Sequence, residues 1–197
     1  MASLKTRLIF QAAIDVFSLR GFEKATMDEI ASRANVAKGT IYYHFKSKEE
    51  LFLFLVTEGT ELLRESVLSK VDHTDTPIDQ IKTIIKEQLN FFGEYRDLCI
   101  ILLREAWGDD SRQHEFRRML VHYVNAIQGI VQAGIQSGDF LPGDPQTGAW
   151  SIFGSISMAA LHHLFTDPNM DLSILAPDLE QWILRGFTPS LNPSQES

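Results

Sequence analysis

Apolar residues recur at helical spacing along most of the 197-residue chain. In residues 4–19, Leu8, Ala12 and their neighbours fall on one helical face, and Gly21 follows as a plausible stop. Similar patterns predict helices over about residues 26–34, 38–44, 47–70, 77–92, 112–136, 145–165 and 177–187. Residues 97–107 suit a short helix or a buried strand, and the lack of a partner strand favours the helix. The pattern therefore predicts an all-α fold of about nine helices.

Side chains that cap helices mark several of the predicted starts. Thr26 with Glu29 and Ser47 with Glu50 have the spacing of a capping box, in which side chain and backbone cap each other. Later starts pair a capping residue with proline in the first helical position, at Thr76-Pro77 and Asp144-Pro145. These signals fix where the helices begin.

The second and third predicted helices form a helix-turn-helix pattern. Both are short, and the turn Asn35-Val36-Ala37 separates them. Small residues at Ala31 and Ala34 let the two helices cross closely. In this motif the second helix enters the DNA major groove with its N-terminal residues foremost. Residues 38–44 are therefore the candidate DNA-reading helix.

That helix carries groups suited to a polyanion. Lys38, Gly39 and Thr40 stand at its start, where unpaired N–H groups and the helix dipole favour phosphate. Tyr42, Tyr43 and His44 follow, and these three consecutive residues point over a wide arc, so that at least one faces outward. Lys48 stands in the first turn of the next helix, close enough to reach the flanking phosphate backbone of the DNA. A structural helical corner with solvated lysines is the competing interpretation.

Charge separates this region from the rest. The formal net charge of the chain is -8. Residues 1–48 hold eight Lys or Arg against four acids, a net charge of +4, so residues 49–197 carry -12. A basic module joined to an acidic one indicates that the module touches nucleic acid and the remainder does not. The charge division predicts a DNA-binding domain at residues 1–48 and a second domain at residues 49–197.

The segment ATMDEIASRANVAKGTIYYHFKSKEELF resembles the signature of the tetracycline-repressor (TetR) family of bacterial transcriptional regulators. The resemblance covers roughly residues 5–55. It implies a homodimeric repressor, less often an activator, that a small molecule releases from a palindromic DNA operator. Residues 49–197 would then be the ligand-binding and dimerisation domain. The family's usual contact positions fall here on Thr26, Lys38, Gly39, Thr40, Tyr42, Tyr43, His44 and Lys48.

Two later segments, residues 119–138 and 145–166, contain no Asp, Glu, Lys or Arg. Each is long enough to span a membrane, but polar residues interrupt both, and no span is expected. A helix without charge on any face is covered on every face. The resemblance implies pairing through the last two helices, and the predicted interface residues are Gly148, Ser151, Ser155, Ala159 and Trp182. An uncharged but simply buried helix is the alternative.

The resemblance also implies an effector pocket among the middle helices. The predicted lining residues are Phe92, Tyr95, Leu102, Arg104, Trp107, Phe116, Leu120, Tyr123 and Phe153. Arg104 either pairs with a nearby acid or receives an anionic head group. The stretch GIQSGDF…GDPQTGAWSIFGSI resembles that of fatty-acyl-responsive members, which suggests a bulky hydrophobic effector. Taken singly, each of these residues suits plain core better than ligand contact.

Other chemistries find little support in the sequence. His162 and His163 are adjacent on a helix, point apart and lack a third ligand, so no metal or other cofactor is expected. Cys99 lies in an apolar run and suits an inert thiol better than a redox sensor. No nucleophile–base constellation indicates an enzyme. A cytoplasmic regulator is the prediction; a helical carrier, an enzyme, a protein adaptor, or a corepressor-dependent or activating regulator are the alternatives.

Overall fold

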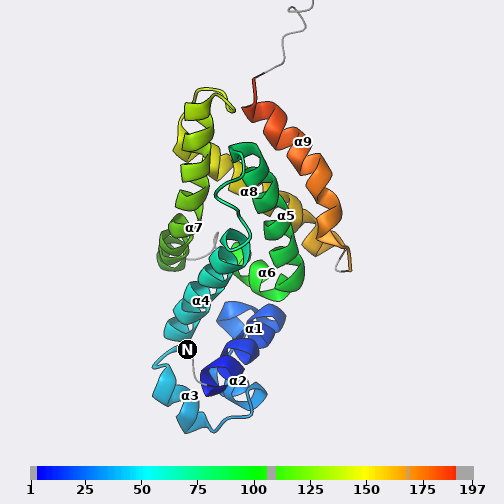
Figure 1. Ribbon diagram of the computed structural model, residues 1–197. Coiled ribbons are helices and arrows are strands. Elements are labelled where there is room, and N and C mark those ends of the chain that lie inside the picture. The colour runs from blue at the N-terminus through cyan, green and yellow to red at the C-terminus, as the bar shows by residue number, and fades with distance from the viewer. Residues whose placement is uncertain (1–3, 106–109, 168, 190–197) are drawn as a thin grey trace, which may run out of the picture. The chain divides into compact units, whose positions relative to one another are not determined.

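The computed structural model describes residues 4–105, 110–167 and 169–189, which form α-helices and one short 3-10 helix, without a strand (Figure 1). The elements are α1 (Leu4–Lys24), α2 (Met27–Arg33), α3 (Lys38–His44), α4 (Lys48–Leu68), α5 (Pro77–Glu94), α6 (Arg96–Glu105), α7 (Asp110–Ser137), α8 (Pro145–Thr166), η1 (Leu172–Leu175) and α9 (Ala176–Phe187). This confirms the all-α prediction, including the helix at residues 96–105. None of the helices described here is long and apolar enough to cross a membrane.

Local capping by side chains explains several of the helix starts. The capping box at Thr26 is complete, because Glu29 N donates to Thr26 Oγ1 at 3.2 Å and Thr26 N donates to Glu29 Oε2 at 3.1 Å. The box at Ser47 is only half made: Glu50 N donates to Ser47 Oγ, but the Glu50 carboxylate accepts from Lys46 N instead. The prediction of a second full box is therefore wrong in that half.

Gly21 separates two helical stretches that lie within the bounds of α1. Its φ of 74° and ψ of 162° are non-helical, and glycine adopts such a positive φ without steric cost. The longer stretch therefore stops at Gly21 as predicted, and a short helical stretch follows the kink as far as Lys24. The 3-10 helix η1, in contrast, has no counterpart in the predicted pattern; it starts where the Asp171 side chain accepts from Ser173 N.

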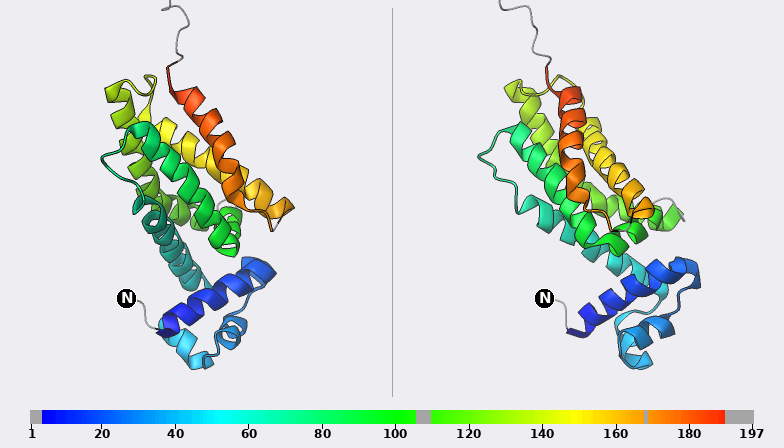
Figure 2. Two further views of the ribbon diagram at one scale, coloured as in Figure 1. Left: turned by 45° about the vertical axis from the view of Figure 1, so that its right-hand side comes forward. Right: turned by 90° about the vertical axis from the view of Figure 1, so that its right-hand side faces the viewer.

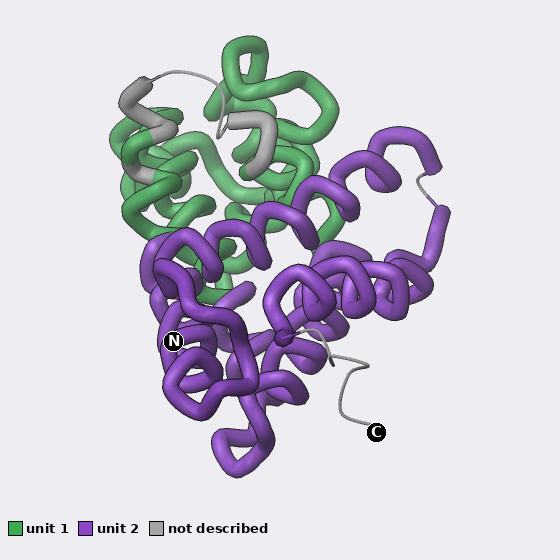
Figure 3. Tube along the Cα trace, turned by 90° about the horizontal axis from the view of Figure 1, so that it is seen from above, with its two compact units in different colours: residues 1–62, 95–120 green, residues 63–94, 121–197 purple. Residues whose placement is uncertain are grey.

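The chain divides into two compact units (Figure 3). Unit 1 comprises residues 1–62 and 95–120, and unit 2 comprises residues 63–94 and 121–197. Helices α4 and α7 each contribute residues to both units. This grouping follows packing rather than binding, so the domain boundary at residue 48 stays a prediction.

Unit 1 is built around α1, which packs against α2 and α6, while α2 packs against α3. Figure 2 shows α2 and α3 on the same side of α1. Phe22 joins Phe17 and Phe52 in an aromatic cluster, with ring centroids 5.6 and 5.1 Å away. Across the outer side, Arg33 Nε donates to Asp15 Oδ2 at 2.8 Å, which ties α2 to α1. The short helices are thus held by a packed core.

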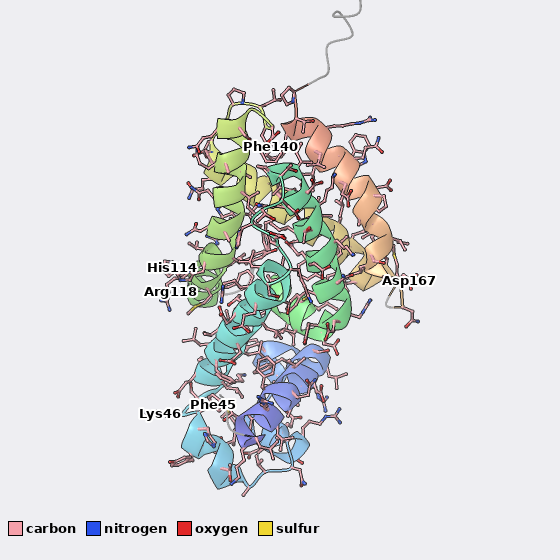
Figure 4. The ribbon with its side chains drawn as sticks, viewed as in Figure 1. Phe45, Lys46, His114, Arg118, Phe140 and Asp167 are labelled. Atoms are coloured by element: carbon pink, nitrogen blue, oxygen red, sulfur yellow. The ribbon has the colours of Figure 1, made fainter. Side chains whose placement is uncertain are left out.

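Unit 2 is built around α5, which contacts α8, α9 and η1, while α8 and α9 contact each other. The turn after α7 is pinned by Phe140 (Figure 4), whose ring lies directly over Gly134. A Cβ at Gly134 would stand only 2.1 Å from that ring, so glycine is required there. Leu141 N also donates to Phe187 O at 2.6 Å, which fixes the turn to the end of α9.

Candidate functional site

Helix α3 has one face in the core and another in solvent. Ile41 is fully buried, and Phe45, which follows the helix, is buried as well. Tyr43 is 85% exposed and Tyr42 is 43% exposed. A single exposed aromatic side chain is normal on a protein surface and needs no explanation. Two adjacent on a seven-residue helix make α3 a candidate binding element.

Lys38, at the start of α3, is held by an acid that sequence reasoning missed. Its Nζ lies 2.7 Å from Asp28 Oδ2, at the start of α2, and 5.8 Å from the centre of the Tyr42 ring. The hydrogen bond that Lys38 donates to the Asp28 carboxylate raises the pKa of Lys38 above its ordinary value, so the side chain is fully charged at neutral pH. The pair holds Lys38 beside Tyr42. Asp28 precedes Lys38 by ten residues, and no local sequence pattern predicts their contact.

The other predicted contact residues of α3 lie near this pair. Gly39 is exposed, and no atom lies within 4 Å of the position that a Cβ would occupy, so the described chain itself does not require glycine there. Thr40 and His44 are half-buried, and the His44 ring meets the Tyr43 ring edge to face at 5.3 Å. The open space at Gly39 allows another molecule to approach the backbone closely.

Thr26 and Lys48, the remaining predicted contacts, are engaged within the chain. The Thr26 hydroxyl donates to Glu29 Oε2 at 3.0 Å as part of the capping box. Lys48 Nζ donates to the backbone oxygens of Glu23 at 3.0 Å and Ala25 at 3.2 Å. Both side chains therefore have structural roles in unit 1 before any DNA is present.

The predicted effector-pocket residues fall in both units. Tyr95, Leu102, Phe116 and Leu120 belong to unit 1, whereas Phe92, Tyr123 and Phe153 belong to unit 2. All are buried except Tyr95, which is half-buried. Trp107 and the side chain of Arg104 lie outside the described part of the structure. Because the set is divided between two units, its convergence on one pocket stays a prediction.

A buried polar network crosses unit 2. Tyr123 Oη on α7 donates to Gln88 Oε1 on α5 at 2.9 Å, and Gln88 Nε2 donates to Ser157 Oγ on α8 at 3.1 Å. Gln88 is 0% exposed and Tyr123 is 1% exposed. Burial raises the pKa of Tyr123, which keeps its phenol protonated as the donor. The network joins three helices, and neither Gln88 nor Ser157 was predicted; Gln88 and Gln80 are the two buried amides among the otherwise apolar buried residues of α5.

Unit 2 also contains a groove of about 1000 Å³. Its described lining residues are Arg64, Glu65, Leu68, Ser69, Val71, His73, Gln80, Ala126, Gly129, Ile130 and Ala133. The small residues of α7 form a smooth wall, and polar groups stand on the side of α4 and the following linker. None of the nine predicted pocket residues is among those that line this groove. It is large enough for a small-molecule ligand.

The outer face of α8 exposes apolar side chains without charge. Met158 is 56% exposed and Phe165 is 55% exposed, while Trp182 on the adjacent α9 is 77% exposed. Ser151 and Ser155 lie on the same exposed face, and their hydroxyls donate to backbone oxygens one turn earlier, at 2.8 Å each. This outer face therefore presents no unpaired hydroxyl and can be covered by an apolar surface.

Two of the predicted interface residues are less exposed than that face. Ala159 is half-buried. Gly148 is buried, with Val131 and Phe187 each 3.1 Å from the position of a Cβ. The glycine therefore permits close packing inside the chain, and its contribution to the outer face is small.

The remaining candidates do not form a site among the described residues. No group of three His, Cys, Asp or Glu side chains stands close enough there to hold a metal ion. Cys99 is buried, and burial raises its pKa, which keeps it a neutral thiol at physiological pH.

An exposed reading helix in a basic helix-turn-helix unit, joined to a larger helical region, defines a DNA-binding transcriptional regulator. The family model described as "Bacterial regulatory proteins, tetR family" matches residues 9–55, and "Tetracyclin repressor-like, C-terminal domain" matches residues 74–161. A regulator from Bacillus subtilis, YhgD, is 30% identical over 93% of this chain and 97% of its own. The chain belongs to the tetR family.

Two solved structures are similar over nearly their whole length. The transcriptional regulator FadR from Bacillus subtilis, solved in complex with stearoyl-CoA, is 26% identical with a TM-score of 0.84, over 91% of this chain and 98% of that one. A structure from Clostridium perfringens, proposed as a fatty acid metabolism regulator, is 35% identical with a TM-score of 0.83, over 92% and 99%.

Proposed function

We propose that the chain is a homodimeric transcriptional repressor that acts in the cytoplasm and is released from DNA by a fatty-acyl effector. In this proposal residues 1–48 bind DNA, and residues 49–197 bind the effector and a second copy. The chain catalyses no reaction. The single observation that carries the DNA role is the exposed part of α3, where Lys38 and two exposed tyrosines accompany the open backbone at Gly39 on one short helix.

The contacts divide into two kinds. Lys38, Tyr42 and His44 bind phosphates, which position the protein, whereas Thr40 and Tyr43 meet base edges. Thr26 contacts the DNA backbone only if its hydroxyl gives up the hydrogen bond to Glu29. Two-fold symmetry of a dimer then requires two half-sites in a palindromic operator.

The acyl effector is supported by relatives and by available space. FadR from Bacillus subtilis was solved with stearoyl-CoA, and its likeness extends over nearly the whole chain. The groove in unit 2 lies at the upper end of the usual range of about 300–1000 Å³ for small-molecule sites. Effector binding releases the protein from DNA only if the effector binds the DNA-free conformation more tightly than the DNA-bound conformation.

The test is fluorescence anisotropy with a duplex from the chain's own upstream region. Stearoyl-CoA should lower the affinity for that duplex, while coenzyme A alone should not. Random duplex of equal length measures the non-specific contribution. Binding that no acyl compound alters would contradict the effector class, and equal affinity for both duplexes would contradict the operator. Tightening by stearoyl-CoA would instead identify a corepressor.

A further inference from the structure

We propose that Lys48 is a positioning residue for DNA reading, which holds the entry of the helix-turn-helix against the first turn of α4, and that it does not bind phosphate. The inference rests on α3 being the reading helix. The first step is the place of Lys48 in unit 1. It is the first residue of α4, and its partners lie 23 and 25 residues earlier, at the junction of α1 and α2.

The ammonium of Lys48 is engaged on several sides. Two of its three N–H donors are directed at Glu23 O, at 3.0 Å, and Ala25 O, at 3.2 Å. Its Nζ also lies 4.6 Å from the centre of the Phe22 ring. Carbonyls at the end of a helix carry partial negative charge and lack helical partners, so a cation there satisfies both needs. A phosphate would have to compete with these contacts.

The contacted segment controls where α2 begins. Ala25 precedes Thr26, the N-cap of α2, and α2 packs against α3. Phe22 is buried against Phe52, one turn beyond Lys48 in α4. The bond to Ala25 O therefore fixes the start of α2 relative to α4, while the aromatic contact fixes the end of α1. Loss of the ammonium should let the α2 start shift and change how α3 meets base edges.

Lys48→Met tests this, because methionine keeps the apolar stem near Phe22 and removes the ammonium. An operator duplex is first selected from random sequences on the unaltered chain. Failure to select any sequence would defeat the DNA-binding function itself and is thereby distinguished from failure of this inference. Affinities for the operator and for random duplex are then measured over a series of salt concentrations, well below the melting temperature of each variant.

We expect Lys48→Met to lower operator affinity by about tenfold, the size of one lost base contact. Affinity for random duplex and the slope of log affinity against log salt should stay unchanged. Lys48→Arg, which can still donate to both carbonyls, should restore operator affinity. Lys46 lies between α3 and α4 and is exposed (Figure 4). Lys46→Met removes this neighbouring charge and should leave the ratio of operator affinity to random-duplex affinity unchanged.

Two results would overturn the inference. If both affinities fall together and the salt slope drops by about 0.9, Lys48 neutralises a phosphate. If neither affinity changes while the melting temperature falls, its contacts stabilise unit 1 without orienting the reading helix.

Discussion

The outward faces of α3 and α8 both expose aromatic or apolar side chains, but only the face of α3 carries charge. On α3, the exposed Tyr42 ring stands near Lys38, which is itself paired with Asp28. On α8, Met158 and Phe165 accompany serines whose hydroxyls are satisfied within the helix. Exposed aromatics beside a cation suit a polyanion, whereas an uncharged face suits a second copy of the same surface. Charge therefore distinguishes the two proposed binding surfaces, which hydrophobicity alone would not separate.

The largest expected effect comes from giving α8 the charge that it lacks. Met158→Asp would place two carboxylates close together in a dimer, so we expect monomers at concentrations where the unaltered chain is dimeric. Operator affinity should fall about 100-fold or more, because each reading head then binds alone. Light scattering and anisotropy measure the two effects.

Leu141→Asp is the matched control for this change. Leu141 is also exposed and apolar, but it lies in the turn between α7 and α8, outside the proposed interface. It should leave the mass unchanged. A dimeric Met158→Asp protein would remove the assignment of this face.

Tyr43→Ala is expected to have the next largest effect. It removes the most exposed side chain of α3 and should lower operator affinity about tenfold, in line with the loss of one base contact. Dimer mass and melting temperature should not change, because Tyr43 contributes little to the core. Unaltered operator affinity would show that α3 does not read DNA through this residue.

Lys38→Met should weaken binding to every sequence alike. If Lys38 neutralises one phosphate, the salt slope should decrease by about 0.9. Asp28→Asn should do the reverse for affinity, because it releases Lys38 from its ion pair and removes a negative charge from the same surface. Parallel salt titrations of the two variants measure both affinities. If both variants change the DNA affinity in the same direction, the Lys38–Asp28 pair does not restrain DNA binding.

Tyr123→Phe should have the smallest effect on DNA binding by α3 and on pairing through α8. It leaves Gln88 Oε1 buried without its donor and should lower the free energy of unfolding by about 1–3 kcal/mol. Operator affinity of the folded protein should stay unchanged. Urea unfolding measures the stability, and unfolding at the same urea concentration as the unaltered chain would show that another group satisfies Gln88.

Local signals predicted the fold and the bounds of α3 well. The predicted range of α3, residues 38–44, is the one observed, because the turn before it is encoded in adjacent residues, although no side chain caps its start. The capping residues Thr26 and Asp144 likewise start their helices as predicted. Such features depend on residues three or four apart, which a sequence pattern can reveal.

Contacts between distant residues were not predictable in this way. Lys48 and Ala25, or Gln88 and Ser157, are 23 and 69 positions apart, and only the packed fold brings them together. The sequence also could not show whether Gly148 faces the interior or the surface, because α8 lacks charge on its buried and exposed faces alike. Residue type identified candidate contacts on α3, but it could not show that Lys48 already has partners.

The most direct test of this account is hydroxyl-radical footprinting of the unaltered chain on its selected operator duplex. A charged α3 face on DNA and an uncharged α8 face between copies predict two equal protected segments, related by two-fold symmetry and centred about 34–36 Å apart or near a multiple of that distance. A single protected segment at saturating protein would contradict pairing through α8, and uniform protection would contradict sequence reading by α3.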